Sequence, residues 1–246
     1  MMKQGIFEII ENEYLIENVL RMKLSGDTSE IKCPGRFVNI KLDGLYLRRP
    51  ISVCDFDENT LTIIYKVVGK GTKLMEGMKK GEKLDVLTGL GNGYDTSLSG
   101  ERPLLLGGGV GVPPLYNLAK RLISEGKKVT VILGFNKKSE VFYEDEFKAL
   151  GAETIVTTVD GSYGKKGFVT DAMKELEYTY FYTCGPEPML KAVYKTSETE
   201  GEMSFEKRMG CGFGACMGCS CKTITGYKRI CKEGPVMKKE EILWED

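Results

Sequence analysis

The sequence predicts an antiparallel β-barrel followed by a Rossmann-like parallel α/β sheet, with a small cysteine-rich domain at its C-terminal end. Residues 3–87 consist of short runs rich in β-branched and aromatic residues, separated by turn residues. From about residue 100, short apolar runs alternate with helical segments of about 10–15 residues. After Gly201 the alternation stops, and five of the eight cysteines lie between positions 211 and 231. The expected domains are residues 1–98, 99–203 and 204–246.

Five segments of the first half carry the strand pattern, each bounded by Gly, Asp, Asn or Pro. They are residues 14–24, 36–42, 51–56, 60–68 and 82–87. In the second half, the expected strands are 103–108, 129–133, 154–159 and 178–183, and the expected helices are 112–126, 144–151, 169–177 and 186–201. Strands that alternate with helices of this length indicate a parallel sheet.

The composition excludes several classes of function. Lys plus Arg and Asp plus Glu number 35 each, so no net charge argues for nucleic acid or an acidic membrane surface. The N-terminal stretch MMKQGIFEIIENEY lacks the apolar run of a signal peptide, and no run of about 18 apolar residues could span a bilayer. We expect a cytoplasmic protein. The chain contains no histidine, which removes the commonest general acid and base, so cofactors are expected to carry the chemistry.

A glycine cluster, GGGVGVPP, joins the first apolar run of the second half to a helix. Glycines at such a join let the backbone approach a pyrophosphate, and the helix start supplies free N–H groups. Gly109 and Gly111 fit the usual GxGxxG pattern, whereas its third position is Pro114, a residue well tolerated in a first helical turn. Taken alone, the cluster is weak evidence, and a tight strand-to-helix turn is the alternative.

Two further turns, Val159–Gly167 and Thr183–Leu190, each follow an apolar strand. Ligands of open α/β sheets bind outside the carboxyl ends of the strands, where all three segments would lie. Gly185 and Pro186 would form a turn against the nicotinamide end of a dinucleotide, with a helix starting at Glu187 or Pro188. Cys184 is interpreted as a small residue at the strand end rather than as a reactive thiol.

The barrel half contains the stretch LRRPISVCDF. Arg49 is a candidate clamp for a flavin diphosphate, because a guanidinium matches phosphate oxygens in bidentate geometry. A solvated surface pair of arginines is the simpler alternative. The stretch KVVGKGTKLMEGM then offers Gly71 and Thr72 at the start of a short helix, with Thr72 as a possible N-cap.

The order of these motifs resembles the ferredoxin–NADP reductase superfamily, an FAD barrel followed by a NAD domain. The resemblance implies FAD contacts at Arg49, Pro50, Ile51, Ser52, Ile64, Tyr65, Lys66, Gly71 and Thr72. It implies NAD contacts at Gly108, Gly109, Gly111, Cys184, Gly185 and Pro186. The aromatic residue that covers the flavin at the C-terminus of many members is not visible, because this chain continues into the cysteine loop.

Three cysteines of that loop, Cys211, Cys216 and Cys219, are spaced C-x4-C-x2-C, and Cys231 follows after eleven residues. This is the ligand spacing of plant-type [2Fe–2S] proteins with a shorter last gap. A Rieske centre is excluded because it needs histidines. A structural zinc site, which usually has two C-x2-C pairs, and redox-active thiols are the alternatives. Cys221 is expected to lie near the cluster without binding it.

The loop MGCGFGACMGCSCK and the ending ICKEGPV resemble the electron transfer subunits of NAD-dependent dihydroorotate dehydrogenase B. The resemblance implies a separate FMN-containing catalytic subunit, in a heterotetramer of two plus two. It also implies electron flow from that subunit through [2Fe–2S] and FAD to NAD+, in pyrimidine biosynthesis. The same residues leave open a related subunit of a hydrogenase or of a ferredoxin:NADP oxidoreductase, and a zinc-stabilised binding module on an inactive reductase scaffold. NAD is preferred over NADP on family grounds, since Lys137 and Lys138 could meet a 2′-phosphate that Glu140 would oppose.

Overall fold

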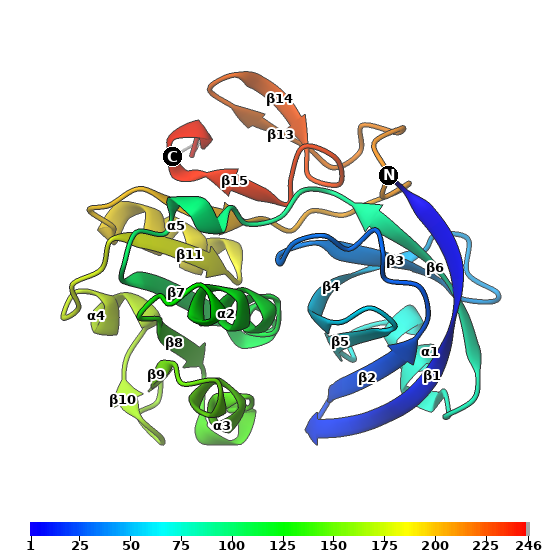
Figure 1. Cartoon of the computed structure of the whole chain (residues 1–246), viewed down its shortest axis with the longest axis horizontal. Coiled ribbons are helices and arrows are strands. Elements are labelled where there is room, and N and C mark those ends of the chain that lie inside the picture. Colours follow the sequence, from blue (N-terminus) through cyan, green and yellow to red (C-terminus); the bar gives the residue numbers. More distant parts are fainter. Residues whose placement is uncertain (245–246) are drawn as a thin grey trace.

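A closed antiparallel barrel, a seven-stranded sheet and a small hairpin make up the computed structural model, which describes residues 1–244 (Figure 1). The predicted fold class is confirmed. The last two residues of the expected domain 204–246 lie outside the described part. Among the described residues, no helix is both long and apolar enough to cross a bilayer.

Six strands close the barrel in the order β1-β2-β5-β4-β3-β6. They are β1 (Lys3–Ile16), β2 (Val19–Ser25), β3 (Phe37–Lys41), β4 (Arg49–Phe56), β5 (Thr60–Lys66) and β6 (Lys83–Leu90), with helix α1 (Lys70–Gly77) between β5 and β6. Alternate residues of each strand point inward and form one apolar core, which includes Phe7, Met22, Ile40 and Ile63. The barrel therefore leaves its outward-facing residues free to meet the other parts of the chain.

The prediction of one strand over residues 14–24 was wrong, because the chain turns in its middle. Glu17 and Asn18 form a two-residue turn between β1 and β2, and Asn18 has a φ of 61°. Asparagine tolerates this left-handed conformation better than most residues, which makes a tight hairpin possible. The charged residues Lys3, Glu8 and Glu13 of β1 are exposed.

The sheet runs in the order β10-β9-β8-β7-β11-β12-β15 and is parallel except for its last strand. Its strands are β7 (Pro103–Gly108), β8 (Thr130–Phe135), β9 (Glu153–Thr158), β10 (Lys165–Lys166), β11 (Tyr180–Cys184), β12 (Gly201–Ser204) and β15 (Val236–Lys238). Its helices are α2 (Pro114–Ser124), α3 (Glu144–Ala149), α4 (Val169–Met173) and α5 (Glu187–Thr196).

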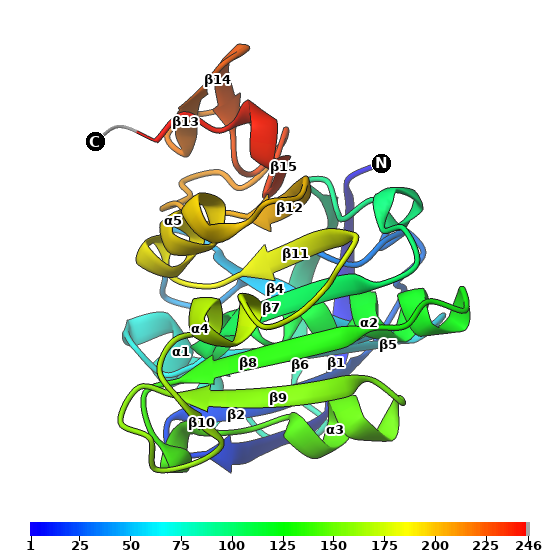
Figure 2. The ribbon, with the colours of Figure 1, turned by 90° about the vertical axis from the view of Figure 1, so that its left-hand side faces the viewer.

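Helices cover both faces of this sheet. Leu105 of β7 packs with α2 and α3, whereas Leu104 and Leu106 pack with α4 and α5, as strand alternation requires. Figure 2 looks onto the face with α4 and α5. The other face is turned to the barrel, where Asp55 of β4 accepts hydrogen bonds from Asn117 (2.6 Å) and Lys120 (3.0 Å) of α2. The glycine-rich start of α2 is thereby held at the junction of the two domains.

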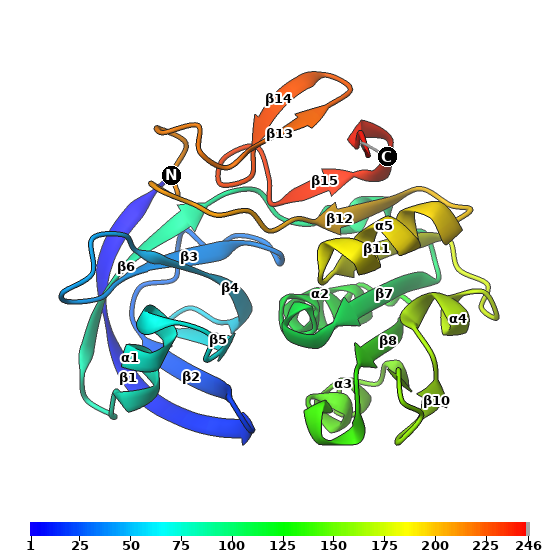
Figure 3. The same cartoon turned by 180° about the vertical axis from the view of Figure 1, so that it is seen from behind.

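The cysteine-rich segment bridges both domains (Figure 3). Its strand β15 pairs antiparallel with β12 at the edge of the sheet, and β13 (Ser220–Thr223) forms a hairpin with β14 (Gly226–Arg229). Neither β12 nor β15 was among the expected strands, since both are short and the second lies beyond the cysteines. The boundary at residue 204 stays a prediction, although the segment beyond it supplies a strand to the sheet.

A buried carboxyl joins the linker between the domains to this edge. Glu202 of β12 is 5% exposed and accepts a hydrogen bond from the backbone N–H of Asp95 (2.9 Å). Lys238 is its neighbour in register on β15. Burial raises the pKa of Glu202 from its usual 4.5 to about 7, because the charged form loses its hydration.

We expect Glu202→Gln to remove a pH dependence of stability. A raised pKa means that the folded state binds the extra proton, so the wild type loses stability as pH rises from 4.5 to about 7. Glutamine keeps an acceptor for Asp95 without the charge. Urea denaturation should give similar free energies of unfolding at pH 5, and a variant more stable by about 2 kcal/mol at pH 8. The exposed Glu200→Gln is the control, and parallel pH curves for wild type and Glu202→Gln would contradict the assignment.

Candidate functional site

The glycine loop after β7 and the turn after β11 touch one another. A Cβ added to Gly111 would lie 2.3 Å from the carbonyl oxygen of Cys184, and one added to Gly185 would lie 3.2 Å from the backbone N of Gly108. Glycine is therefore required on both sides of the contact. The structure thus brings together Gly108, Gly109, Gly111, Cys184, Gly185 and Pro186 at the carboxyl edge of adjacent parallel strands.

The backbone of this loop faces open space at Gly109. Gly109 has a φ of 53°, and nothing lies within 4 Å of the Cβ that another residue would carry. Helix α2 begins at Pro114, two residues after the expected start, and α5 begins at Glu187, as expected. Two helix starts at one edge of a parallel sheet suit a ligand with phosphate groups. Burial raises the pKa of the Cys184 thiol to about 12, so that this side chain stays a neutral packing group.

The third turn, Val159–Gly167, lies farther along the same edge, beside the end of β8. The hydroxyl of Ser162 accepts a hydrogen bond from the backbone N–H of Lys138 (2.8 Å), and the Lys138 ammonium lies 5.6 Å from the centroid of the Tyr163 ring. The Glu140 carboxylate accepts a hydrogen bond from the Asn136 side chain (2.8 Å). Lys138, one of the two lysines considered for a 2′-phosphate, therefore lies over the Tyr163 ring, and the Glu140 carboxylate is close to it in the chain.

Arg49 and Gly71 meet at the other predicted phosphate site. A Cβ on Gly71 would lie 2.1 Å from Nε of Arg49, so only glycine lets the guanidinium pass over the first turn of α1. The free N–H groups of that turn and a bidentate cation thus lie together, which fits a diphosphate. The N-cap of α1 is Gly69 and not Thr72. The Thr72 hydroxyl instead accepts hydrogen bonds from the backbone N–H groups of Val68 (3.0 Å) and Gly69 (3.3 Å).

A cavity of about 710 Å³ opens beside this helix start. It is lined by Asp43, Gly44, Leu45, Val67, Val68, Gly69, Lys70, Lys73 and Leu74. Residues 43–45 were not predicted to lie at a site, because their loop carries no pattern beyond that of a turn. The cavity adds room for a ligand that continues from the phosphate site.

The other residues of β4 and β5 take different positions. Pro50, Ile51 and Ser52 are partly exposed along the first half of β4, opposite Asn39, Val38 and Phe37 of β3. Ile64 is buried in the cluster that joins the barrel to α2, and Lys66 is exposed. Tyr65 points into the barrel, where its hydroxyl donates to Asn12 Oδ1 (2.9 Å). Tyr65 can therefore offer only its backbone to a ligand outside the barrel, since its neighbours in the strand point the other way.

The four predicted metal ligands form two pairs. The backbone N–H groups of Cys211 and Cys216 donate to each other's sulfur (3.5 and 3.4 Å), and that of Cys231 donates to Cys219 Sγ (3.4 Å). Cys216 is exposed, whereas Cys219 and Cys231 are 3% and 2% exposed. Within residues 1–244, no three Cys, Asp or Glu side chains converge on a point that would suit one ion. Two pairs of thiols are the donor set that a two-iron cluster needs, two for each metal.

Backbone N–H groups point at the sulfur of the first ligand. Ala215 and Cys216 donate to Cys211 Sγ at 3.2 and 3.4 Å. Burial raises the pKa of Cys211, but the N–H groups of Phe213, Cys216 and Ala215 outweigh it and lower the value to about 6. Gly212 and Gly214 have φ values of 77° and 93°, the conformation that lets the loop turn its N–H groups inward. The loop is therefore built for thiolates.

Two residues near the loop behave differently from the ligands. Cys221 donates its S–H to the carbonyl oxygen of Lys228 (3.6 Å) across the β13–β14 hairpin. Asn39, a residue that the sequence analysis missed, is 1% exposed and donates to the carbonyl oxygen of Cys211 (3.2 Å). It lies opposite Pro50 in the barrel, so one side chain links the predicted flavin strand to the cysteine loop. An asparagine in an apolar strand is the only sequence signal for it.

Comparisons with known proteins identify the family. Residues 206–243 match a model of the iron–sulfur cluster binding domain of dihydroorotate dehydrogenase B, and residues 105–195 match a model of an oxidoreductase NAD-binding domain. The dihydroorotate dehydrogenase B (NAD+) electron transfer subunit of Fusobacterium nucleatum subsp. nucleatum is 49% identical, over 94% of this chain and 95% of that one. The corresponding Geobacillus subunit is 45% identical, over 99% and 100%. The chain belongs to this family of electron transfer subunits.

Two solved structures share the fold of this chain. An NADH-dependent reduced ferredoxin–NADP oxidoreductase, studied for flavin-based electron bifurcation, is 32% identical. It superposes with a TM-score of 0.88 over 97% of this chain and 90% of that one. A ferredoxin NADP+ reductase from Neisseria gonorrhoeae, 16% identical with a TM-score of 0.68 over 79% and 89%, shares the fold.

We expect Gly212→Ala to empty the cluster site of iron. A Cβ at position 212 would lie 2.2 Å from Nδ2 of Asn39, and a φ of 77° already disfavours alanine. Gly126→Ala is the matched control, because Gly126 has a φ of 81° and nothing within 4 Å of the added carbon. Both variants should lose about 1 kcal/mol of stability from backbone strain. Iron analysis should show a loss only in Gly212→Ala, and equal iron in both would contradict the contact.

Proposed function

We propose that the chain carries electrons between NAD(H) and an FMN-containing dihydroorotate dehydrogenase subunit. Its cofactor sites are the four paired cysteines and the site at Arg49 and the first turn of α1. It is an oxidoreductase subunit whose cofactors are FAD, a [2Fe–2S] cluster and NAD. One observation carries the proposal. Asn39 contacts the Cys211 carbonyl group and lies opposite Pro50, so the cysteine loop rests on the strand next to the predicted flavin strand.

A flavin bound in this arrangement would exchange a hydride with NAD(H) and single electrons with the cluster. NAD(H) and the cluster could not exchange electrons directly, because NAD(H) transfers pairs and the cluster single electrons. The residues of the chain hold and orient these groups. In the proposal, Arg49 and the first turn of α1 bind the FAD diphosphate, and Pro50, Ile51, Ser52, Ile64, Lys66 and the Tyr65 backbone border the flavin. Cys211, Cys216, Cys219 and Cys231 hold the cluster.

The nucleotide side needs no acid or base. In the proposal, Gly108, Gly109 and Gly111 let the pyrophosphate of the dinucleotide approach the protein backbone. The turn at Gly185 and Pro186 borders the nicotinamide. We assign NAD rather than NADP to this site. The ammonium of Lys138 lies over the Tyr163 ring, and the Glu140 carboxylate would repel a 2′-phosphate.

The partner is proposed to dock on the exposed side of the cysteine loop, as a heterotetramer of two plus two. Phe213 and Met217 flank the ligands and are 44% and 52% exposed, and Tyr227 at the tip of the β13–β14 hairpin is 72% exposed. Exposed large apolar side chains in the cysteine-rich segment favour a protein partner. Eight cysteines without a disulfide suit a reducing, cytoplasmic setting.

A second candidate is a subunit of an electron-bifurcating ferredoxin–NADP oxidoreductase, favoured by the similarity to that solved structure. The two candidates predict different electron donors for the same cofactors. Dihydroorotate added with the catalytic subunit should produce NADH only under the first proposal, whereas reduced ferredoxin would be the donor under the second.

The proposal is tested on the purified chain and then on its complex. Anaerobic addition of NADH should bleach flavin absorption bands and produce the rhombic EPR signal of a reduced two-iron cluster, with about two irons per chain. Co-purification with the FMN subunit should give dihydroorotate-dependent NADH formation and the mass of a heterotetramer. A colourless chain containing zinc would overturn the electron-transfer function. A coloured chain that ignores dihydroorotate in the complex would overturn only the choice of partner.

Gly71→Ala should weaken FAD binding about tenfold or more, because the added carbon displaces the Arg49 guanidinium from the diphosphate site. Gly77→Ala is the control at the other end of α1, since nothing lies within 4 Å of the carbon added there. Flavin fluorescence during FAD titration measures both affinities. Equal affinities in the two variants would show that Arg49 does not hold the diphosphate.

A further inference from the structure

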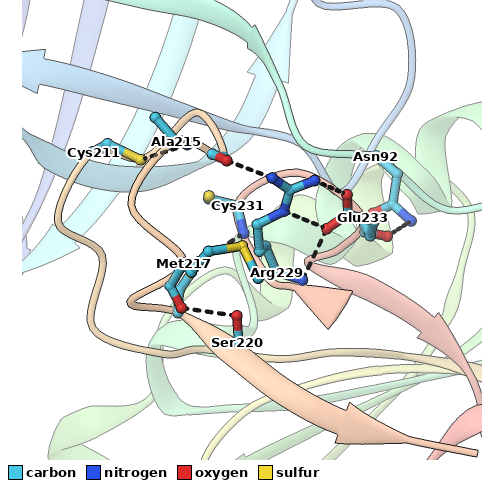
Figure 4. A network of polar contacts seen from close by, with 10 residues as sticks. Asn92, Cys211, Ala215, Met217, Ser220, Arg229, Cys231 and Glu233 are labelled. Atoms are coloured by element: carbon cyan, nitrogen blue, oxygen red, sulfur yellow. Dashed lines mark hydrogen bonds and ion pairs between the residues drawn. The ribbon is translucent and has the colours of Figure 1, made fainter. Parts of the chain in front are cut away.

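A charged network ties the two halves of the cysteine site together (Figure 4). The guanidinium of Arg229, at the end of β14, donates through Nη1 to the carbonyl oxygen of Gly214 (2.5 Å). Gly214 lies between Cys211 and Cys216, whereas Arg229 lies two residues before Cys231. Arg229 therefore joins the segment of one thiol pair to the segment of the other.

The peptide plane between Gly214 and Ala215 gives this contact a second consequence. In a trans peptide the carbonyl oxygen and the N–H point in opposite directions. The oxygen of Gly214 is held by Arg229, and the N–H of Ala215, on the other side of the plane, donates to Cys211 Sγ (3.2 Å). The arginine thus fixes the direction of a hydrogen bond to a ligand sulfur that it does not itself touch. Gly214 permits this plane because its φ of 93° is readily adopted by glycine.

The guanidinium is held in place from behind. Nε of Arg229 donates to Glu233 Oε2 (3.0 Å) and Nη2 donates to Oε1, while the same carboxylate accepts from the Arg229 backbone N–H (2.8 Å). The carbonyl oxygen of Glu233 in turn accepts from the side chain of Asn92 (3.0 Å), in the linker between barrel and sheet. A fork of this kind leaves Nη1 free for the Gly214 carbonyl group, a geometry that lysine cannot reproduce.

We propose that Arg229 is a positioning residue of the cluster site, which raises the reduction potential of the cluster by directing the Ala215 N–H at Cys211 Sγ. The inference rests on the proposed function. An N–H···S hydrogen bond stabilises negative charge on sulfur, and the reduced cluster carries one more negative charge than the oxidised one. Removing the bond therefore favours the oxidised form.

A positive charge near the cluster would also raise the potential, so the test separates charge from orientation. Arg229→Lys keeps the charge and loses the fork. Lys232→Met removes a charge beside the same loop, since a Cβ on Gly214 would lie 2.6 Å from Cδ of Lys232, and leaves the guanidinium untouched. EPR-monitored redox titration of the flavin-loaded chain measures the cluster potential in each, and pulsed EPR in D2O measures the exchangeable proton near the sulfur.

We expect Arg229→Lys to shift the equilibrium constant for cluster reduction about tenfold toward the oxidised form, a fall of 59 mV for one electron. The exchangeable-proton coupling should weaken with it, while Lys232→Met stays near the wild type, because water and salt screen the charge of this exposed side chain. An unchanged potential in Arg229→Lys overturns the inference, as does a fall in potential with the proton coupling intact. If Arg229→Lys loses the cluster, Glu233→Gln, which keeps the arginine and all four cysteines but weakens the fork, must weaken the exchangeable-proton coupling, and an intact coupling overturns the inference. A wild-type chain without iron overturns the proposed function as well, whereas a normal wild-type cluster confines any failure to Arg229.

Discussion

The cysteine-rich segment is too small to fold on a core of its own, and this constraint shapes the whole molecule. Below about 70–80 residues a hydrophobic core alone is rarely enough, and small domains usually add a metal, a disulfide or a neighbour. This segment uses neighbours on two sides. Ile230, Cys231 and Met237 pack against Phe37, Leu87 and Leu90 of the barrel, and β15 pairs with β12 at the edge of the sheet. The position of the cysteines is therefore set by both domains at once.

The same constraint explains why the linker between the domains carries so many polar contacts. The side chain of Asn92 donates to the carbonyl oxygens of Glu233 and Val236 and accepts from the N–H of Val236. Two residues later, Tyr94 donates to the carbonyl oxygen of Thr183 on β11 (3.0 Å), and Asp95 donates its backbone N–H to Glu202. One short segment thus contacts the cysteine segment, the strand before the predicted nicotinamide turn and the sheet edge. Barrel, sheet and cysteine site are held in one arrangement by contacts that no single domain could make.

The parts of this arrangement that follow from local patterns could be predicted from the sequence. Glycine clusters at strand ends, the C-x4-C-x2-C spacing and the alternation of strands and helices each reflect a rule that acts over a few residues. The turn at Asn18 escaped because a two-residue hairpin without glycine interrupts an otherwise continuous strand pattern. The edge strand β15 escaped because pairing with β12 is a long-range choice, made by a three-residue segment with no periodicity to detect.

The site shows the same division between what is local and what is not. The spacing of the cysteines could be predicted, but the roles of Asn39 and Arg229 could not, since each depends on which carbonyl oxygen the folded chain presents to it. Thr72 was a possible N-cap in the sequence and is not the N-cap in the structure, because the sequence does not show at which of several small residues the helix begins. Tyr65 shows the converse limit. Strand alternation shows that Tyr65 and its two neighbours point to opposite faces. Which face is the inside of the barrel depends on the register of the whole strand.

A chain without histidine performs its chemistry by presenting backbone. The loop from Cys211 to Cys216 aims N–H groups at a sulfur, and under the proposed function the first turn of α1 and the glycine loop before α2 present theirs to phosphate groups. A backbone dipole cannot be adjusted by titration, and a side chain added to glycine would block it. It can be adjusted from behind, through whatever binds the carbonyl oxygen of the same peptide. The guanidinium of Arg229 on the Gly214 oxygen is such an adjustment. Arg229 lies on the far side of the peptide plane from the Cys211 sulfur that it affects. A residue of this kind is found from the carbonyl oxygen that it binds, because it makes no contact with the cysteine itself.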